Sequence, residues 1–178
     1  DGTKTMKPIL TMQNQYKPAS FASFGDSITY GFGTTGSYPK RLGGKLNCVV
    51  MNRGVNSTTA DQARIKLQAE TQFHNHFVII WFGHNDIGSG TVADVKADID
   101  ACVATLASSG NTSNFLILGT LNSRSPATNM IAGSAGHTFV TTLNSQLAAA
   151  YPNNFFDMRA YLVSLGSGAD LTNDIIAT

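Results

Sequence analysis

Charge, metal-ligating clusters and long apolar runs are all scarce in this sequence. Charged residues make up 13% of the 178 residues, and 12 basic against 11 acidic side chains leave a formal charge of +1. No cluster of lysine and arginine marks a nucleic-acid-binding face, so nucleic acid is not an expected partner. No stretch approaches the ~18 consecutive apolar residues of a membrane span, so a membrane is not expected as a partner either.

Residues that form disulfides or bind metals are few. The two cysteines, Cys48 and Cys102, cannot build a disulfide framework, and both lie in apolar runs. We expect buried free thiols, because free cysteine is among the most buried residue types. His74 and His76 have no cysteine or carboxylate cluster nearby, which is not zinc-ligand spacing, and we expect them to be exposed. No metal or cofactor is expected.

The remaining composition suits one compact domain. Hydrophobic residues make up 42% of the chain, enough for a sizeable core. Residues 1–18 show little periodicity and are expected to be an N-terminal arm or linker, with the domain spanning residues 19–178. A surface rich in Asn, Ser, Thr and Gly suggests an extracellular, secreted, virion-associated or carbohydrate-facing protein.

Short apolar runs alternate with helical patterns along the domain. Strands are predicted at residues 21–24, 48–51, 77–82, 115–118 and 155–156, with helices at 38–46, 58–72, 92–109, around 140–147 and at 161–165. Thr58 with Asp61, and Thr91 with Asp94, have the spacing of helix-starting caps. The alternation predicts an α/β fold, with a mostly parallel sheet of five strands covered by helices on both faces. The long polar loop from Asn122 to Gly136 is a candidate lid or substrate-contact segment.

Polar residues follow the first three predicted strands. Ser27, Gly54 and Asn85 each lie just past a strand's carboxyl end, where open α/β folds bind their ligands. Ser27 is the candidate nucleophile, and the N–H groups of Ser27 and Gly54 with the amide of Asn85 form a candidate oxyanion hole.

Each of these residues has a structural alternative. Ser27 could cap a helix, Gly54 could provide a turn conformation, and Asn85 could hold a loop through backbone bonds. Asp86 is expected to stabilise its loop. For His84, substrate contact and loop filling are equally open, and His137 is expected to have a surface or capping role.

Three segments of this sequence carry a family resemblance. Gly25-Asp26-Ser27-Ile28-Thr29, Asn52-Arg53-Gly54 and Gly83-His84-Asn85-Asp86 resemble, in matching order, the first three blocks of the GDSL or SGNH hydrolases. The resemblance covers roughly residues 20–165. It implies a flavodoxin-like, three-layer α/β/α fold and esterase or acyl-hydrolase activity, with Ser27 as nucleophile and Gly54 and Asn85 as oxyanion donors.

The third block, preceded by Phe82, is similar to that of rhamnogalacturonan and other polysaccharide acetylesterases. This similarity favours a serine esterase that removes acetyl groups from a carbohydrate through an acyl-enzyme. The expected substrate is a small-molecule or polysaccharide ester.

The carboxyl end departs from the family pattern. The family places an Asp and a catalytic His three residues apart, but Asp170 is followed at that spacing by Asn173, and Asp174 by Ala177. No histidine follows His137. We expect the Asp-x-x-His segment and the last helix to lie beyond Thr178, in a continuing segment of the same polypeptide. The alternative is a catalytically incomplete carbohydrate-binding or structural module of a larger phage or surface protein.

Overall fold

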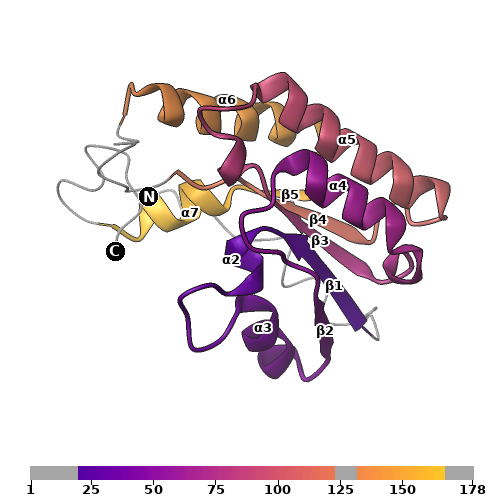
Figure 1. Ribbon diagram of the computed structural model, residues 1–178. Coiled ribbons are helices and arrows are strands. Elements are labelled where there is room, and N and C mark those ends of the chain that lie inside the picture. The colour runs from indigo at the N-terminus through magenta and orange to yellow at the C-terminus, as the bar shows by residue number, and fades with distance from the viewer. Residues whose placement is uncertain (1–19, 123–131, 167–178) are drawn as a thin grey trace, which may run out of the picture.

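The structure is a computed structural model that describes residues 20–122 and 132–166 (Figure 1). These residues form one parallel sheet with the strand order β2-β1-β3-β4-β5. The strands are β1 (Ser20–Gly25), β2 (Val49–Asn52), β3 (Phe77–Trp81), β4 (Phe115–Leu118) and β5 (Phe155–Phe156). The predicted five-stranded α/β fold is confirmed. The arm at residues 1–18, most of the candidate lid and the Asp170 and Asp174 segment lie outside the described residues.

Helices lie on both faces of this sheet. They are α2 (Ser27–Tyr30), α3 (Tyr38–Leu46), α4 (Ala60–Ala69), α5 (Val92–Ser108), α6 (Ala135–Ala150) and α7 (Met158–Ser164), with short 3-10 helices at Thr71–Phe73 and His84–Asp86. Figure 1 shows α4, α5 and α6 together over one face, with α3 on the opposite side beside β2. The result is the expected three-layer α/β/α arrangement.

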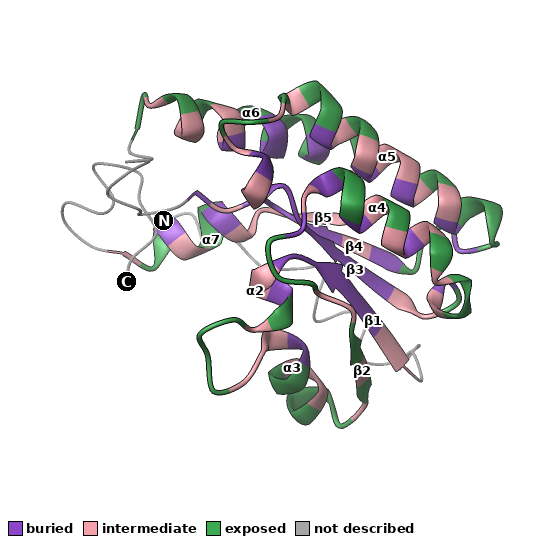
Figure 2. Ribbon diagram, viewed as in Figure 1, coloured by how far each residue is buried: buried purple, intermediate pink, exposed green. Residues whose placement is uncertain are grey.

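The central strands are apolar on both faces. Val78 and Ile80 of β3 are buried in the core beneath α4, α5 and α6, whereas Ile79 and Trp81 belong to a second cluster on the other face. Successive side chains of a strand point to opposite faces, so a strand covered on both sides reads as a continuous apolar run. Figure 2 shows β3 as largely buried, while the outward sides of the helices are exposed.

The second strand is less buried than the sequence predicts. The side chains of Val49 and Met51 are 54% and 40% exposed. β2 is an edge strand that pairs only with β1 within the described sheet. The strand predicted at 48–51 is confirmed as Val49–Asn52, but the expectation that it is buried is wrong, because an apolar run does not distinguish an edge strand from a central one.

The predicted caps of α4 and α5 can be compared with the observed ones. At α5 the prediction is confirmed, since the Thr91 hydroxyl accepts a hydrogen bond from the N–H of Asp94 at 3.1 Å. At α4 the cap is Thr59, which forms a capping box with Gln62. The predicted cap, Thr58, instead donates its hydroxyl to the Val55 carbonyl at 2.9 Å. The cap prediction is off by one residue because two threonines stand side by side.

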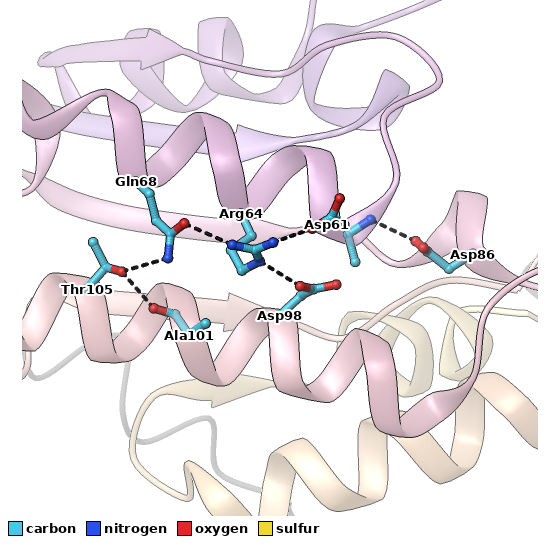
Figure 3. Close-up of polar contacts among 8 residues, drawn as sticks. Asp61, Arg64, Gln68, Asp86, Asp98, Ala101 and Thr105 are labelled. Atoms are coloured by element: carbon cyan, nitrogen blue, oxygen red, sulfur yellow. Dashed lines mark hydrogen bonds and ion pairs between the residues drawn. The ribbon is translucent and has the colours of Figure 1, made fainter.

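A polar ladder joins α4 to α5 (Figure 3). The Arg64 guanidinium pairs with Asp98 of α5 at 2.7 Å, with Asp61 on its own helix, and with Gln68 at 2.9 Å. Gln68 in turn donates to the hydroxyl of Thr105 at 3.3 Å. The ladder therefore fixes the two helices in register along their shared edge.

His74 shows that the expectation of exposed histidines was wrong. Its side chain is 2% exposed, with Nδ1 2.8 Å from the Ser109 hydroxyl and Nε2 2.8 Å from the Leu67 carbonyl. His76 is half-buried. His74 thus joins the end of α4 to the end of α5, which is a structural use that its spacing from His76 does not reveal.

Both cysteines are free thiols, as expected. Cys102 is buried, and Cys48 is only partly buried. None of the helices in residues 20–122 and 132–166 combines the length and apolar character that a membrane span requires.

The core beneath α4 gives a stability prediction. Leu67→Ala should lower the free energy of unfolding by about 2–5 kcal/mol, because it leaves a cavity at a fully buried position. Ile65→Ala, on the same helix but 52% exposed, should change it by about 0.5 kcal/mol or less. Urea denaturation of both variants measures the difference, and equal losses would contradict this assignment of the α4 faces.

Candidate active site

The carboxyl ends of three adjacent strands carry the residues singled out from the sequence. β1 lies between β2 and β3, and all three run parallel. Ser27 follows β1, Gly54 follows β2 and Asn85 follows β3. The fold therefore brings the three sequence blocks to one edge of the sheet.

Ser27 is the first residue of the four-residue helix α2. Asp26 precedes it as the helix cap and accepts a hydrogen bond from the N–H of Ile28 at 2.9 Å. The N–H groups of a helix's first turn have no partner within the helix. The Ser27 N–H therefore belongs to the set of donors that a helix start offers to an anion.

Two glycines allow α2 to sit directly on the sheet edge. A Cβ at Gly25 would collide with the Thr29 hydroxyl and the Trp81 carbonyl. A Cβ at Gly54 would collide with the Tyr30 nitrogen and lie 2.7 Å from the Thr29 carbonyl carbon. The loop after β2 thus packs against the backbone of α2 at a distance that only glycine permits.

Asn52 connects that loop to α2, a role the sequence analysis did not identify. Its Nδ2 donates to the carbonyls of Thr29 at 2.9 Å and Tyr30 at 3.3 Å, and to the Ser37 hydroxyl at 3.2 Å. Its Oδ1 accepts the Gly54 N–H at 3.0 Å. The available signal was an amide residue at a strand end, two positions before the glycine.

This bond qualifies the predicted role of Gly54. The Gly54 N–H already has an acceptor in Asn52 Oδ1, so a substrate oxygen would have to share it or replace that acceptor. Three-centre bonds of this kind are common at helix ends and turns.

Asn85 uses one of its two amide hydrogens within the described part of the chain. It lies in the 3-10 helix that begins after Gly83, whose φ of 105° favours glycine. Asn85 Nδ2 donates to the Thr58 carbonyl at 2.9 Å. This bond orients the amide, and the second hydrogen of Nδ2 remains for another acceptor.

Asp86 holds the third block against α4. Its Oδ2 accepts the N–H of Ala60 at 3.0 Å, a bond drawn in Figure 3 at the start of α4. The carboxylate is buried, and that burial raises its pKa. The predicted loop-stabilising role of Asp86 is confirmed.

Asp26 is buried beside the candidate nucleophile. It is 1% exposed, and burial raises its pKa, while the N–H of Ile28 and the charge of His84 lower the pKa in part. Its Oδ2 has no hydrogen-bond partner among the described residues. A carboxyl group in this setting favours its protonated form relative to an exposed one.

His84 and His137 are placed differently. His84 Nδ1 lies 2.9 Å from the Leu121 carbonyl, which requires a proton on Nδ1; in the neutral form of the ring, Nε2 is then the acceptor. The backbone N–H of His137 donates at 3.2 Å to the hydroxyl of Ser134, which is the cap of α6, so the surface or capping role expected for His137 stays a prediction. The choice between substrate contact and loop filling for His84 stays open.

A group of hydroxyls lies under α2. Ser23, Thr29 and Tyr38 are packed together on the face of the sheet opposite α4, and the pKa of Tyr38 is raised to about 12 by burial, with the two smaller hydroxyls lowering it in part. The phenol therefore stays protonated at neutral pH and supports α2 as a neutral group. Within residues 20–122 and 132–166, no group of three or more His, Cys, Asp or Glu side chains could hold a metal ion.

The parallel sheet between two helix layers, with its serine block after β1, defines a hydrolase fold of the SGNH type. The chain belongs to the GDSL-like lipase/acylhydrolase family, whose model matches residues 23–174. The general chemistry of that family is ester hydrolysis. A search of curated proteins found no match.

Solved structures share this fold at low sequence identity. The SGNH-hydrolase family esterase AlinE4 has a TM-score of 0.66 at 20% identity, covering 88% of this chain and 84% of its own. A G-D-S-L family protein from Desulfitobacterium hafniense DCB-2 has a TM-score of 0.63 at 23% identity, covering 81% and 79%. The psychrotrophic esterase EstA from Pseudoalteromonas sp., in a structure inhibited by monoethylphosphonate, has a TM-score of 0.59 at 14% identity, covering 86% of each chain.

The buried carboxyl of Asp26 predicts a pH effect on stability. Because the folded pKa is raised above its unfolded value of about 4, the parent should lose stability as pH rises from there through the folded pKa. Asp26→Asn keeps a good cap residue but cannot ionise. The stability of the variant relative to the parent should therefore increase between pH 4 and pH 7, by about 1.4 kcal/mol for each unit of the shift.

Urea denaturation of both proteins at several pH values measures this difference. The other acidic groups are common to the two proteins, so their titration cancels. A difference that is constant with pH would contradict a raised pKa at Asp26.

Proposed function

We propose that this protein is a serine esterase that forms a covalent acyl-enzyme on Ser27 and acts on acetyl esters of carbohydrate. The observation that carries the proposal is the placement of Ser27 at the start of α2, on glycine contacts and Asn52 bonds that hold the helix against the sheet. A serine at a helix start has N–H donors beside its own hydroxyl, which is the geometry that an oxyanion needs.

In the proposed reaction, Ser27 Oγ attacks the carbonyl carbon of the ester and its proton passes to a base. The negative charge that develops on the carbonyl oxygen is stabilised by the Ser27 N–H and by the second amide hydrogen of Asn85. The Gly54 N–H contributes while shared with Asn52 Oδ1. The alcohol leaves with the proton, and water then attacks the acyl-enzyme and releases the acid.

The preference for a small acyl group rests on the sequence. The Gly83-His84-Asn85-Asp86 block is similar to that of polysaccharide acetylesterases, and the segment after α2 has no side chain at positions 31 and 33, on either side of Phe32. An open site of this kind suits a bulky alcohol part with a small acyl part. A polysaccharide substrate also agrees with the proposed extracellular or virion-associated location.

The base of the proposed reaction is the histidine of an Asp-x-x-His pair after Thr178. His84 is the described histidine at this edge, and its Nε2 is an available acceptor. An assay with 4-nitrophenyl acetate distinguishes a base after Thr178 from His84. It compares the present chain with a chain extended past Thr178, each with and without His84→Gln. Both versions of the extended chain should be active.

Two other outcomes of that assay change the conclusion. Activity of the present chain that is lost in His84→Gln would assign the base to His84. Activity in neither chain, with a histidine in the extension, would contradict the esterase proposal and support a carbohydrate-binding or structural module that has lost catalysis.

The roles of Ser27 and Asn85 predict graded losses in the extended chain. Ser27→Ala should abolish acyl-enzyme turnover, and Asn85→Ala should lower kcat by ~10² to 10³ because one oxyanion donor is lost. Ser108→Ala, an exposed serine at the far end of α5, is the matched control and should keep full activity.

Covalent trapping provides an independent readout. EstA, which shares this fold, was obtained with a phosphonate inhibitor. A fluorophosphonate should label this protein once, and peptide mass spectrometry should locate the label on Ser27. Labelling at another serine, or equal labelling of Ser27→Ala, would contradict the proposed nucleophile.

A further inference from the structure

We propose that a pocket beside α2 binds a carboxylate on the alcohol part of the ester substrate, with Arg41 as the residue that determines this specificity. The inference rests on the proposed function for its connection to catalysis. The pocket and its charge are observed independently of that function.

The pocket lies between α2, the loop that follows it, α3 and the end of β3. Its volume is about 460 Å³, and Ile28, Phe32, Tyr38 and Trp81 form apolar walls, with Arg41 among its lining residues. This volume is within the ~300–1,000 Å³ typical of small-molecule sites. Aromatic walls with one cationic group suit a compact ring that carries an anionic substituent.

Arg41 is oriented but not neutralised. Its Nε donates to the Gly36 carbonyl at 3.1 Å, which fixes the plane of the guanidinium. No carboxylate pairs with it in the described part of the chain, whereas Arg53 and Arg64 are both held in ion pairs. The two Nη groups can therefore bind a carboxylate side by side, the geometry in which arginine binds this group best.

The helix that forms one wall of the pocket carries only basic charges. α3 contains Lys40, Arg41 and Lys45 and no acidic residue. The buried carboxyl of Asp26 lies within electrostatic reach of Tyr38, another wall residue. The positive charge of α3 complements an anionic ligand, and an unpaired cation beside apolar walls distinguishes the pocket from a purely apolar acyl site.

The position of the pocket connects it to the proposed nucleophile. Ile28, one of its walls, directly follows Ser27 in α2. Successive residues of a helix point about 100° apart, so an ester whose carbonyl is bound at Ser27 reaches this pocket with a part of its alcohol that extends around the turn of α2. The substrate class that fits is an acetyl ester of a carboxylate-bearing, ring-shaped alcohol.

A matched pair of substrates tests the inference. The acetyl esters of 4-hydroxybenzoate and 4-hydroxybenzamide differ in charge but hardly in shape. In the extended chain, kcat/KM should favour the benzoate by about tenfold or more, mainly through KM. Arg41→Gln should lower the ratio of the two values about tenfold, to the ratio that the leaving groups alone set, and Arg41→Lys should retain part of the preference.

Lys45→Gln is the matched control. It removes one positive charge from the same helix but does not line the pocket, so the ratio should stay at the parent value. A parent ratio near one, or a ratio that Arg41→Gln and Lys45→Gln lower equally, would overturn the assignment to Arg41.

The intrinsic fluorescence of Trp81 measures binding without catalysis. Trp81 is the single tryptophan of the chain and lines the pocket. Cyclohexanecarboxylate should change its emission saturably, cyclohexanecarboxamide should bind at least about tenfold more weakly, and Arg41→Gln should remove the difference.

The two measurements separate failure of the inference from failure of the proposed function. If neither ester is hydrolysed, the esterase proposal fails, and the fluorescence titration still decides whether the pocket binds a carboxylate through Arg41. No saturable response to the carboxylate would overturn the pocket proposal.

Discussion

The position of the candidate nucleophile depends on the close contact between two backbones. The loop after β2 approaches α2 so closely that Gly54 cannot carry a Cβ, and Asn52, the last residue of β2, donates to the carbonyls of Thr29 and Tyr30. A four-residue helix has too few internal hydrogen bonds to be stable by itself. The direction of the Ser27 N–H is therefore set by the second sequence block as much as by the first.

Buried carboxyl groups accept backbone N–H groups at the starts of α2 and α4. Asp26 caps α2, and Asp86 accepts the first N–H of α4, which the Arg64 ladder then joins to α5. Burial disfavours the ionised form of both carboxyl groups and so raises their pKa. Each carboxyl nevertheless accepts a backbone N–H in the first turn of a helix, a donor that would otherwise be unpaired. Asp86 and the Arg64 ladder thus join the third sequence block to α4 and α5, whereas Asp26 acts within α2.

The sequence predicted the sheet and the order of the site segments because both depend on local pattern. The apolar runs mark β1 to β5, and Ser27, Gly54 and Asn85 follow strands that prove to be neighbours. Exposure of Val49 and burial of His74 were missed, because both depend on which elements pack together. The same reason explains Asn52: its partners Thr29 and Ser37 are distant in the sequence, and the bonds exist only after β1 and β2 pair.

The geometry of α2 explains how one short helix can serve two different parts of a substrate. Successive residues of a helix point about 100° apart, so Ser27 and Ile28 cannot face the same direction. Ile28 lines the pocket that Arg41 and Trp81 complete, which leaves Ser27 on a separate side of the same turn. The proposed cleavage at Ser27 and the proposed recognition of the alcohol part therefore use different faces of α2, and the packing of Gly54 and Asn52 on this helix holds the two faces in place.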